Sequence, residues 1–270
     1  MQKGLMMSNK EYRKAKGVSS TDLKKMSKSP AHFRYWKENG DEIDSPSLLF
    51  GRSVHKYMLE KDDFFKEFAV APVVDRRTKA GKEEWSRFVE ENAGKDIISA
   101  EDFKVIEYMH KALYETQHVK QLLSGVKERS FFVKDESTGI IKKCRPDCLT
   151  DLEFASVIID YKSCNDASDE EFMKQAIKLE YDLQLAYYKD IVDEVTNEDC
   201  LVVFIAQEKT PPYAVNVLEA NEYFIKSGRD LYRTRIDLYA ECEKSGKWPG
   251  YVRGSINVLG LPGWLQKQYE

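Results

Sequence analysis

Apolar residues recur at helical spacing through most of the first 125 residues. Within 100–123 they stand three or four positions apart, as Phe103, Ile106 and Met109 do, which is the period of an amphipathic helix. The segment 45–60 carries apolar positions at similar spacing and predicts a second helix. Shorter helices are expected over three further segments, 21–27, 30–36 and 82–92, whereas 63–72 is expected to be extended.

The pattern changes after Gly125, where short apolar runs alternate with turn residues. Two strands, 126–134 and 140–149, are predicted around a turn at 137–139. Further strands are predicted at 155–163, 201–206 and 213–218, and further helices at 168–179, 181–195 and 220–245. The tail from Lys247 has no clear period. This order predicts an α/β fold, in which a mixed central sheet flanked by helices follows a mostly helical N-terminal half.

The length and composition of the chain fit a single domain with one sizeable core. The chain has 270 residues, of which 42% are hydrophobic and 33% charged, so nothing indicates wholesale disorder. We expect a helical N-terminal part at 1–125, a core at 126–220, and a C-terminal helix and tail at 221–270. No apolar run is long enough for a membrane span and the first ten residues lack the apolar centre of a signal peptide, so a cytoplasmic protein without a membrane partner is expected.

Charge and cysteine content exclude few classes of protein function. The net charge of −4 argues weakly against a protein that merely coats DNA, although a basic groove can coexist with an acidic exterior. The five cysteines form no CxxC pair, which fits free thiols in a reducing compartment. Cys144 and Cys148 have a spacing that could suit a metal, but no second pair of His or Cys completes the set, so no zinc is expected.

The predicted strand 155–163 contains two charged residues that share one face. Side chains alternate along a strand, so Asp160 and Lys162 project together with Ile158. Burying such charges is costly unless they are paired or bind an ion. Taken alone, this Asp-x-Lys pattern is more often a structural ion pair than a catalytic site.

A third charged residue changes that interpretation. Asp147 follows Pro146 on the preceding predicted strand, and a hairpin connection would bring it beside Asp160. Two carboxylates in contact repel each other, so a divalent cation between them is a natural resolution. Mg²⁺ suits such a site, because it binds through few carboxylates, several waters and substrate phosphate oxygens. Lys162 could then orient the attacking water and offset charge in the transition state.

The spacing of Pro146-Asp147 and Asp160-x-Lys162 resembles the PD-(D/E)xK nuclease motif. Glu128, on the first predicted strand, lies where these nucleases often carry another acidic ligand, although a solvated strand residue would look the same. Gln184 and Tyr188 lie four positions apart on one face of a predicted helix, which matches the Q-x-x-x-Y element of the RecB-like branch.

An upstream element strengthens the resemblance to that branch. Gly51 and His55 form a G-x-x-x-H pattern like the one found there, and residues 204–215 resemble the late hairpin of phage recombination exonucleases. Over about 20–220 the chain is most similar to the RecE-like (exonuclease VIII) group, which is related to lambda exonuclease and has a restriction-endonuclease-like core. The resemblance implies a Mg²⁺-dependent 5′→3′ exonuclease, with Mn²⁺ able to substitute, that acts on the ends of linear double-stranded DNA and leaves 3′ overhangs.

The resemblance also implies partners and residue roles. The partners would be a homo-oligomeric ring of copies around DNA and a RecT/Redβ-like annealing protein, in a phage or prophage system of a bacterial cytoplasm. The residues expected to act in catalysis are His55, Glu128, Asp147, Asp160, Lys162 and Gln184. The expected metal ligands are His55, Glu128, Asp147, Asp160 and the carbonyl group of Tyr161. The residues expected to contact DNA are Arg13, Ser20, Thr21, Arg145 and Tyr188.

The role of Arg13 with Ser20 or Thr21 would be to bind a 5′-phosphate, as an arginine and a hydroxyl do in the family. A surface arginine and a helix cap would give the same local sequence. The hydrolysis expected of such a site is in-line attack assisted by two metal ions.

Two other functions fit part of the pattern. An AddB-like or CRISPR-adaptation-type nuclease would carry an iron–sulfur cluster on four cysteines, one of them before the nuclease core. No cysteine precedes Cys144, so no iron–sulfur cluster is expected. A catalytically inactive DNA-end-binding protein is the other alternative. The intact set of Asp147, Asp160 and Lys162 argues against it, since charges this costly are usually lost together with activity.

Overall fold

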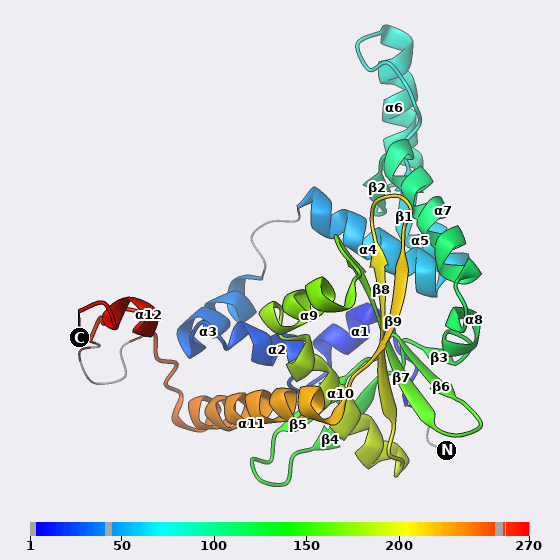
Figure 1. Cartoon of the computed structure of the whole chain (residues 1–270). Helices are drawn as coiled ribbons and strands as arrows, with labels where there is room; N and C mark the ends of the chain where they lie inside the picture. The colour runs from blue at the N-terminus through cyan, green and yellow to red at the C-terminus, as the bar shows by residue number, and fades with distance from the viewer. Residues whose placement is uncertain (1–3, 41–44, 252–255, 257, 270) are drawn as a thin grey trace.

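A five-stranded mixed sheet forms the centre of the protein in the computed structural model, which describes residues 4–40, 45–251, 256 and 258–269 (Figure 1). The strands lie in the order β3, β6, β7, β8, β9. Their bounds are Val126–Lys127 (β3), Cys148–Asp151 (β6), Ser156–Cys164 (β7), Leu201–Glu208 (β8) and Val215–Glu219 (β9). The pair β7–β8 is parallel, and the other pairs in this sheet are antiparallel. The mixed sheet flanked by helices confirms the predicted fold class.

Two smaller sheets and twelve α-helices complete the described part of the chain. The small sheets pair β1 (Phe68–Val70) with β2 (Asp96–Ile98), and β4 (Phe131–Lys134) with β5 (Ile141–Cys144). The helices before β3 are α1 (Asn9–Lys14), α2 (Ser20–Lys25), α3 (Pro30–Asn39), α4 (Pro46–Leu59), α5 (Phe64–Glu67), α6 (Lys79–Glu91), α7 (Ala100–Glu115) and α8 (Val119–Leu122). Those after β7 are α9 (Asp169–Lys178), α10 (Tyr181–Thr196), α11 (Glu222–Ser245) and α12 (Gly263–Gln266).

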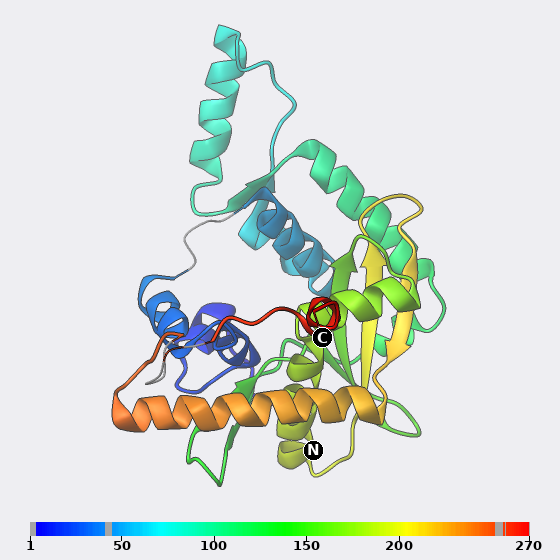
Figure 2. The same cartoon turned by 60° about the vertical axis from the view of Figure 1, so that its left-hand side comes forward.

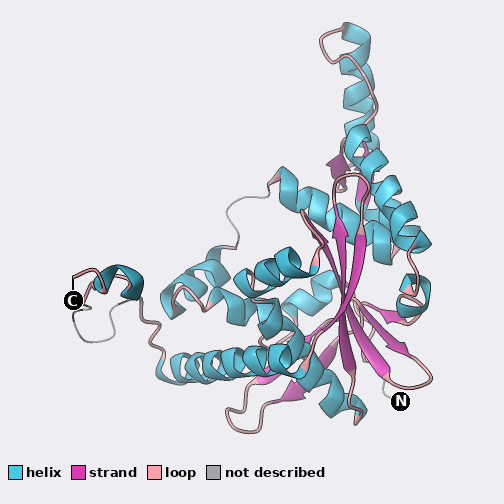
Figure 3. Ribbon diagram, in the orientation of Figure 1, coloured by secondary structure: helices cyan, strands magenta, loops and turns pink. Residues whose placement is uncertain are grey.

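Helices cover both faces of the central sheet, and each face has its own apolar core (Figures 2 and 3). On one face, Ile158 of β7 packs in a cluster with residues of α2, α9, α10 and α11. On the other, Ile159 and Tyr161 pack with residues of α4 and α7. This split confirms the predicted alternation along β7, and it explains why that strand is apolar on both sides.

Side-chain caps and proline positions explain where many helices begin. Ser19 accepts a hydrogen bond from the backbone N–H of Asp22 at the start of α2, and Ser45 does the same for Leu48 in α4. Pro30 and Pro46 stand in the first turns of their helices, where a missing N–H costs nothing. Helix α6 projects from the body (Figure 1), and Gly81 is the one buried residue among its thirteen.

Three sequence-based predictions need correction. The segment 63–72 is not simply extended: a 3₁₀ turn and α5 precede the short strand β1. The helix expected over 100–123 ends at Glu115, because Thr116 adopts an extended backbone conformation (ψ 136°), and α8 starts only after His118 (φ 66°). The hairpin expected over 126–149 is divided into two pairs of strands, β4–β5 and β3–β6, which belong to different sheets.

The division of that hairpin happens at two residues of the predicted site. Glu128 adopts φ 54°, a conformation that a non-glycine residue takes rarely, and its backbone N–H donates to the carbonyl oxygen of Asp147 at 3.2 Å. The chain between β5 and β6 contains Pro146, which removes a donor from the strand ladder. At Glu128 the chain therefore passes from β3 of the central sheet to β4 of the small sheet, and around Pro146 it passes back from β5 to β6.

Among the described residues, no helix is long and apolar enough to cross a membrane.

Candidate metal centre

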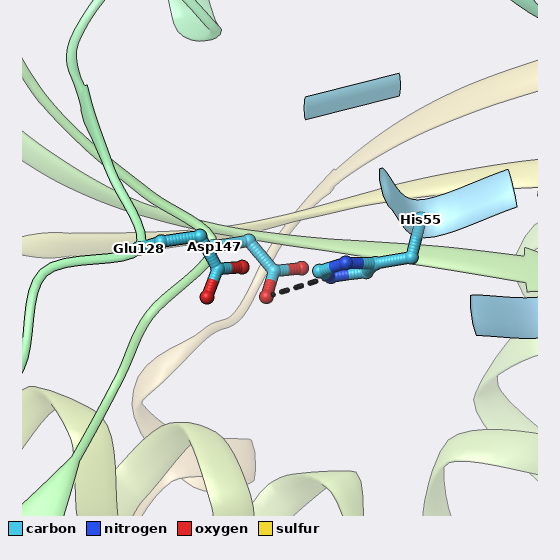
Figure 4. A group of neighbouring side chains, drawn as sticks. All are labelled: His55, Glu128 and Asp147. Atoms are coloured by element: carbon cyan, nitrogen blue, oxygen red, sulfur yellow. Dashed lines mark ion pairs between the residues drawn. The ribbon is translucent and has the colours of Figure 1, made fainter. Parts of the chain in front are cut away.

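Three predicted site residues meet at the point where the hairpin divides. His55 comes from α4, Glu128 from the connection after β3, and Asp147 from the connection before β6. One potential ligand atom from each lies within 4.8 Å of the other two (Figure 4). The Nε2 atom of His55 lies 3.0 Å from Oδ1 of Asp147. An imidazole nitrogen and two carboxylates are donors that can hold a divalent cation such as Mg²⁺ or Mn²⁺.

The carboxylate of Asp147 is oriented by the central sheet. Its Oδ2 atom accepts a hydrogen bond from the backbone N–H of Tyr161 at 2.7 Å, across the β6–β7 hairpin. The side chain is 11% exposed, and that of His55 is 36% exposed, so the centre is open on the His55 side. The hairpin thus brings Asp147 beside the β7 strand that contains Asp160.

Electrostatics in the group favour a bound cation. Burial and the neighbouring charge of Asp147 raise the pKa of Glu128 to about 7. Burial alone would lower the pKa of His55, but the carboxylate of Asp147 raises it to about 9. Burial would raise the pKa of Asp147, yet the attraction of His55 outweighs it and holds that pKa below its ordinary value. The two carboxylates therefore attract positive charge at this position, and a cation bound there would take the place of the proton on His55.

Asp160 and Lys162 form the second part of the site. Their side chains are ion-paired on one face of β7, and Asp160 is fully buried. The other carboxylate oxygen of Asp160 accepts a hydrogen bond from Nε2 of Gln184 at 2.8 Å. Asp160 is therefore held by Lys162 and Gln184, and it does not belong to the three-residue group of His55, Glu128 and Asp147.

Gln184 on α10 links the charged strand to two further residues. Its Nε2 atom lies 3.3 Å from the hydroxyl oxygen of Tyr188, one helical turn along. Its Oε1 atom accepts a hydrogen bond from Nζ of Lys24 on α2 at 2.9 Å. The predicted face of Gln184 and Tyr188 is therefore real, and it points toward Asp160.

Lys24 is a site residue that sequence reasoning missed. Its ammonium group lies 4.9 Å from the ring centre of Tyr181, and that of Lys162 lies 5.1 Å from the same ring. Burial and the nearby charge of Lys162 lower the pKa of Lys24 to about 7. Burial would lower the pKa of Lys162 as well, but Asp160 and Asp147 raise it above its ordinary value. No local pattern distinguishes Lys24 from any other helix lysine, because its role depends on packing of α2 against α10.

Arg145 has a contact within the site. Its Nε atom lies 2.6 Å from Oε2 of Glu128, and its guanidinium lies 5.9 Å from the ring centre of Tyr12. Its Nη1 atom is buried without a hydrogen-bond partner in the described structure. The arginine thus offsets the charge of Glu128, and a DNA contact by Arg145 stays a prediction.

The predicted 5′-phosphate residues are not joined to one another. Arg13 is exposed on α1 and makes no ion pair with any residue that the structure describes. Ser20 is buried at the start of α2, whereas Thr21 beside it is exposed. Ser19, not Ser20, caps the helix. The three residues lie on neighbouring N-terminal helices, and their role stays a prediction.

Comparison with known proteins adds a family and a fold. The family model described as "PDDEXK-like domain of unknown function (DUF3799)" matches residues 19–260. The crystal structure of a candidate exonuclease from Eubacterium rectale matches with a TM-score of 0.63 at 15% identity, over 98% of each chain, which shows a common fold. A phage-related exonuclease from Haemophilus somnus covers 88% of this chain and all of its own at 15% identity, with a TM-score of 0.35 that is too low to compare folds. None of the curated proteins matches the sequence.

Proposed function

The chain belongs to the PDDEXK-like family that matches residues 19–260, and from this premise we propose that it is a metal-dependent exonuclease on linear double-stranded DNA. Family membership supports a nuclease. The observation that carries the proposal is the assembly of His55, Glu128 and Asp147 beside the paired Asp160 and Lys162. The proposed direction of digestion, 5′ to 3′ with a 3′ overhang for annealing-type recombination, rests on the motif resemblance to RecE-like exonucleases.

The residues of the centre fit a divalent cation. His55, Glu128 and Asp147 would hold it, and Asp160 and the carbonyl oxygen of Tyr161 are proposed as further ligands. A buried and a half-buried carboxylate side by side are costly, as the raised pKa of Glu128 indicates, and a cation would relieve that cost. When bound, Mg²⁺ or Mn²⁺ supplies Lewis acidity toward the phosphate and lowers the pKa of coordinated water.

The other polar residues position charge around the phosphate. Lys162 keeps its proton at neutral pH, so its ammonium group can offset the negative charge that grows on the phosphoryl oxygens. Asp160 holds that ammonium group in place, and Gln184 fixes the orientation of the Asp160 carboxylate. The backbone N–H of Tyr161 keeps one oxygen of Asp147 fixed. Each of these contacts exists before substrate binds, so little reorganisation is needed during the reaction.

A digestion assay with end-labelled DNA tests the proposal. The wild-type protein with Mg²⁺ should release nucleotides from linear duplex, from the 5′ end of each strand, and should leave closed circular duplex intact. Asp160→Asn should reduce the rate at least a hundredfold, because it removes the charge that holds Lys162, while binding to the same DNA persists. Asp230→Asn, at an exposed position on α11, is the matched control and should digest normally.

The outcomes of this assay separate the functions. Cleavage of circular duplex would identify an endonuclease, and release from the 3′ end would contradict the proposed direction. Binding without any cleavage, in Mg²⁺ and in Mn²⁺, would identify a DNA-end-binding protein. Digestion at the wild-type rate by Asp160→Asn would show that the activity lies elsewhere.

The proposed 5′-phosphate site needs its own comparison. Duplexes with a 5′-phosphate should be digested several-fold faster than duplexes with a 5′-hydroxyl, because a cation such as Arg13 binds the dianion strongly. Arg13→Ala should remove most of that preference and leave the rate on 5′-hydroxyl ends unchanged. Lys10→Ala, also exposed on α1, is the control for loss of one positive charge. Equal preference in wild type and Arg13→Ala would exclude Arg13 from the pocket.

The proposed partners are a ring of identical subunits and a RecT/Redβ-like annealing protein. Both partners are proposed from the family resemblance. A ring also fits the proposed activity, since an exonuclease that stays on one DNA molecule benefits from enclosing it. Light scattering of the purified protein should give the mass of a closed oligomer, either a trimer or a tetramer. A monomer at micromolar concentration, with or without DNA, would contradict the ring.

A further inference from the structure

A polar cleft lies directly beyond Lys162 on the central sheet. It has a volume of about 500 Å³ and is lined by residues at the end of β7, on α9 and after β8. Ser163 and Cys164 form its floor, Lys174 and Lys178 approach it from α9, and Lys209 closes it from the side of β8. No residue of this cleft belongs to the site proposed above.

The cleft and the candidate metal centre are connected through Tyr181. Gln175, which lines the cleft, lies close enough to the hydroxyl group of Tyr181 to act on its pKa, which burial raises and Gln175 lowers. The ring of Tyr181 in turn lies 5.1 Å from the ammonium group of Lys162. Since Cys164, which lines the cleft, follows Lys162 by two positions on the same face of β7, a ligand in the cleft would lie next to the group that acts on the scissile phosphate.

The charge that this cleft offers to a ligand is positive. Glu171 pairs with Lys174 at 2.7 Å. Asp166 accepts the backbone N–H of Ser168 at 2.9 Å and keeps its negative charge, which the two lysines Lys178 and Lys209 together outweigh. Lys178 and Lys209 make no ion pair with any residue in the described ranges. The backbone N–H of Lys209 donates to the carbonyl oxygen of Cys164 at 3.2 Å, which ties this lysine's segment to the end of β7.

An apolar side chain stands beside these lysines. Leu179, at the end of α9, lines the cleft and is 45% exposed. Two lysines for phosphate and an apolar contact for a base or sugar are the features of a nucleotide site. The volume also lies within the roughly 300–1,000 Å³ of clefts that hold ligands of that size.

We propose that this cleft binds a nucleotide of the DNA strand adjacent to the scissile phosphate, with Lys178 and Lys209 on its phosphates and Leu179 against its base or sugar. The inference rests on the proposed nuclease function and extends it. It assigns to the chain a strand-binding site that the nuclease motif does not contain. A DNA strand held there would lie next to Lys162, because the cleft residues Ser163 and Cys164 belong to the same β-strand as Lys162.

Binding measurements on the full-length chain test the proposal. Fluorescence anisotropy of a labelled single-stranded oligonucleotide, with Ca²⁺ in place of Mg²⁺ to prevent cleavage, gives affinity and its dependence on salt. The double variant Lys178→Ala/Lys209→Ala should bind about tenfold more weakly, and the slope of log affinity against log salt should fall by about 1 to 2, one contact being lost per lysine. Lys178 is exposed and Lys209 is half-buried without an ion pair among the described residues, so the melting temperature should change little.

Turnover separates strand binding from chemistry. In the double variant, kcat/KM for DNA should fall about tenfold further than kcat/KM for bis(p-nitrophenyl) phosphate, a diester too small to reach both the metal centre and the cleft. The loss on DNA should appear mainly in KM. Lys226→Ala/Lys244→Ala, which removes two exposed lysines of α11, is the control and should leave both measurements at the wild-type values.

Three results distinguish failure of this inference from failure of the proposed function. Wild-type affinity and salt dependence in the double variant, with normal DNA digestion, would overturn the cleft and keep the nuclease. Cleft-dependent binding by a protein that never cleaves DNA would keep the cleft and overturn the nuclease. A wild-type protein that neither binds nor cleaves DNA would overturn both.

Discussion

Asp147 and Asp160 have opposite electrostatic environments although both are buried carboxylates. Burial raises the pKa of Asp160, and Lys162 opposes that effect without overcoming it. The pKa of Asp147 is lowered, because His55 and the backbone N–H of Tyr161 favour its charged form despite burial. Asp147 is therefore the more strongly ionic ligand. Asp160 acts first on Lys162, and a direct contact of Asp160 with a cation stays a proposal.

Asp135 illustrates the same balance away from the site and yields a pH prediction. It accepts hydrogen bonds from Arg233 on α11 at 2.6 and 3.0 Å and from the side chain of Ser137 at 2.9 Å. Burial alone would raise its pKa, but these contacts hold the pKa of Asp135 well below its ordinary range. Its contribution to folding is thus present above the unfolded-state pKa of about 3.9 and disappears as pH falls through the lower folded value.

Asp135→Asn should therefore lower the free energy of unfolding by about 2 kcal/mol at pH 7. This is less than the loss expected when a fully buried ion pair is broken, because Arg233 is partly exposed to solvent. Urea denaturation at pH 7, 5 and 3 should show the gap to wild type narrowing below about pH 4. Asp230→Asn is the matched control and should show no gap. A gap of constant size from pH 7 to pH 3 would contradict the argument.

At the scale of elements, the packing of α11 on α10 depends on one glycine. A Cβ atom added at Gly228 would lie 1.9 Å from the backbone carbonyl oxygen of Asp182 in α10. The contact is with backbone, so no flexible side chain can move away. α10 also supplies Gln184, which means that the position of α11 supports the orientation of Asp160.

Gly228→Ala should force the two helices apart and lower the free energy of unfolding by roughly 1–3 kcal/mol. For a chain of this size, that corresponds to a fall in melting temperature of roughly 2–12 °C, measured by calorimetry. Gly51→Ala in α4 is the control, since a Cβ there meets nothing within 4 Å and should be neutral or slightly stabilising. Equal melting temperatures for Gly228→Ala and wild type would show that α11 adjusts without cost.

At the scale of the whole molecule, the candidate centre couples parts of the chain that are distant in sequence. Its residues come from α4, from the two connections around the β4–β5 sheet, from β7 and from α10. A cation bound there would hold these elements together only in the folded state. Binding should therefore stabilise the entire domain by mass action.

Mg²⁺ at a hundred times its dissociation constant should raise the free energy of unfolding by about 2.7 kcal/mol. The melting temperature should rise by roughly 5–11 °C, and EDTA should reverse the shift. In Asp147→Asn the shift should be lost, because the most strongly ionic ligand is gone, whereas Asp230→Asn should keep it. An equal shift in wild type and Asp147→Asn would place the binding of Mg²⁺ elsewhere.

Sequence periodicity by itself was enough to predict the bounds of the longest elements of the C-terminal half. Strand β7 and helices α9, α10 and α11 lie within two residues of their predicted bounds, because apolar alternation and helical spacing determine which face is buried. The shared face of Asp160 and Lys162 and the approach of Asp147 followed from the same rules. The residue types of the centre, and hence its chemistry, were also present in the sequence.

Tertiary structure decided which of these residues meet. Glu128 joins His55 and Asp147 because of a left-handed backbone conformation and a division of the hairpin that no periodicity encodes. The pairing of Arg145 with Glu128 follows from the same division of the hairpin. The approach of Lys24 to Gln184 depends on the packing of the N-terminal helix α2 against α10. Side chains that lie far apart in the chain are brought together by burial of apolar surface elsewhere, so the partner of a buried charge is known only once the elements have packed.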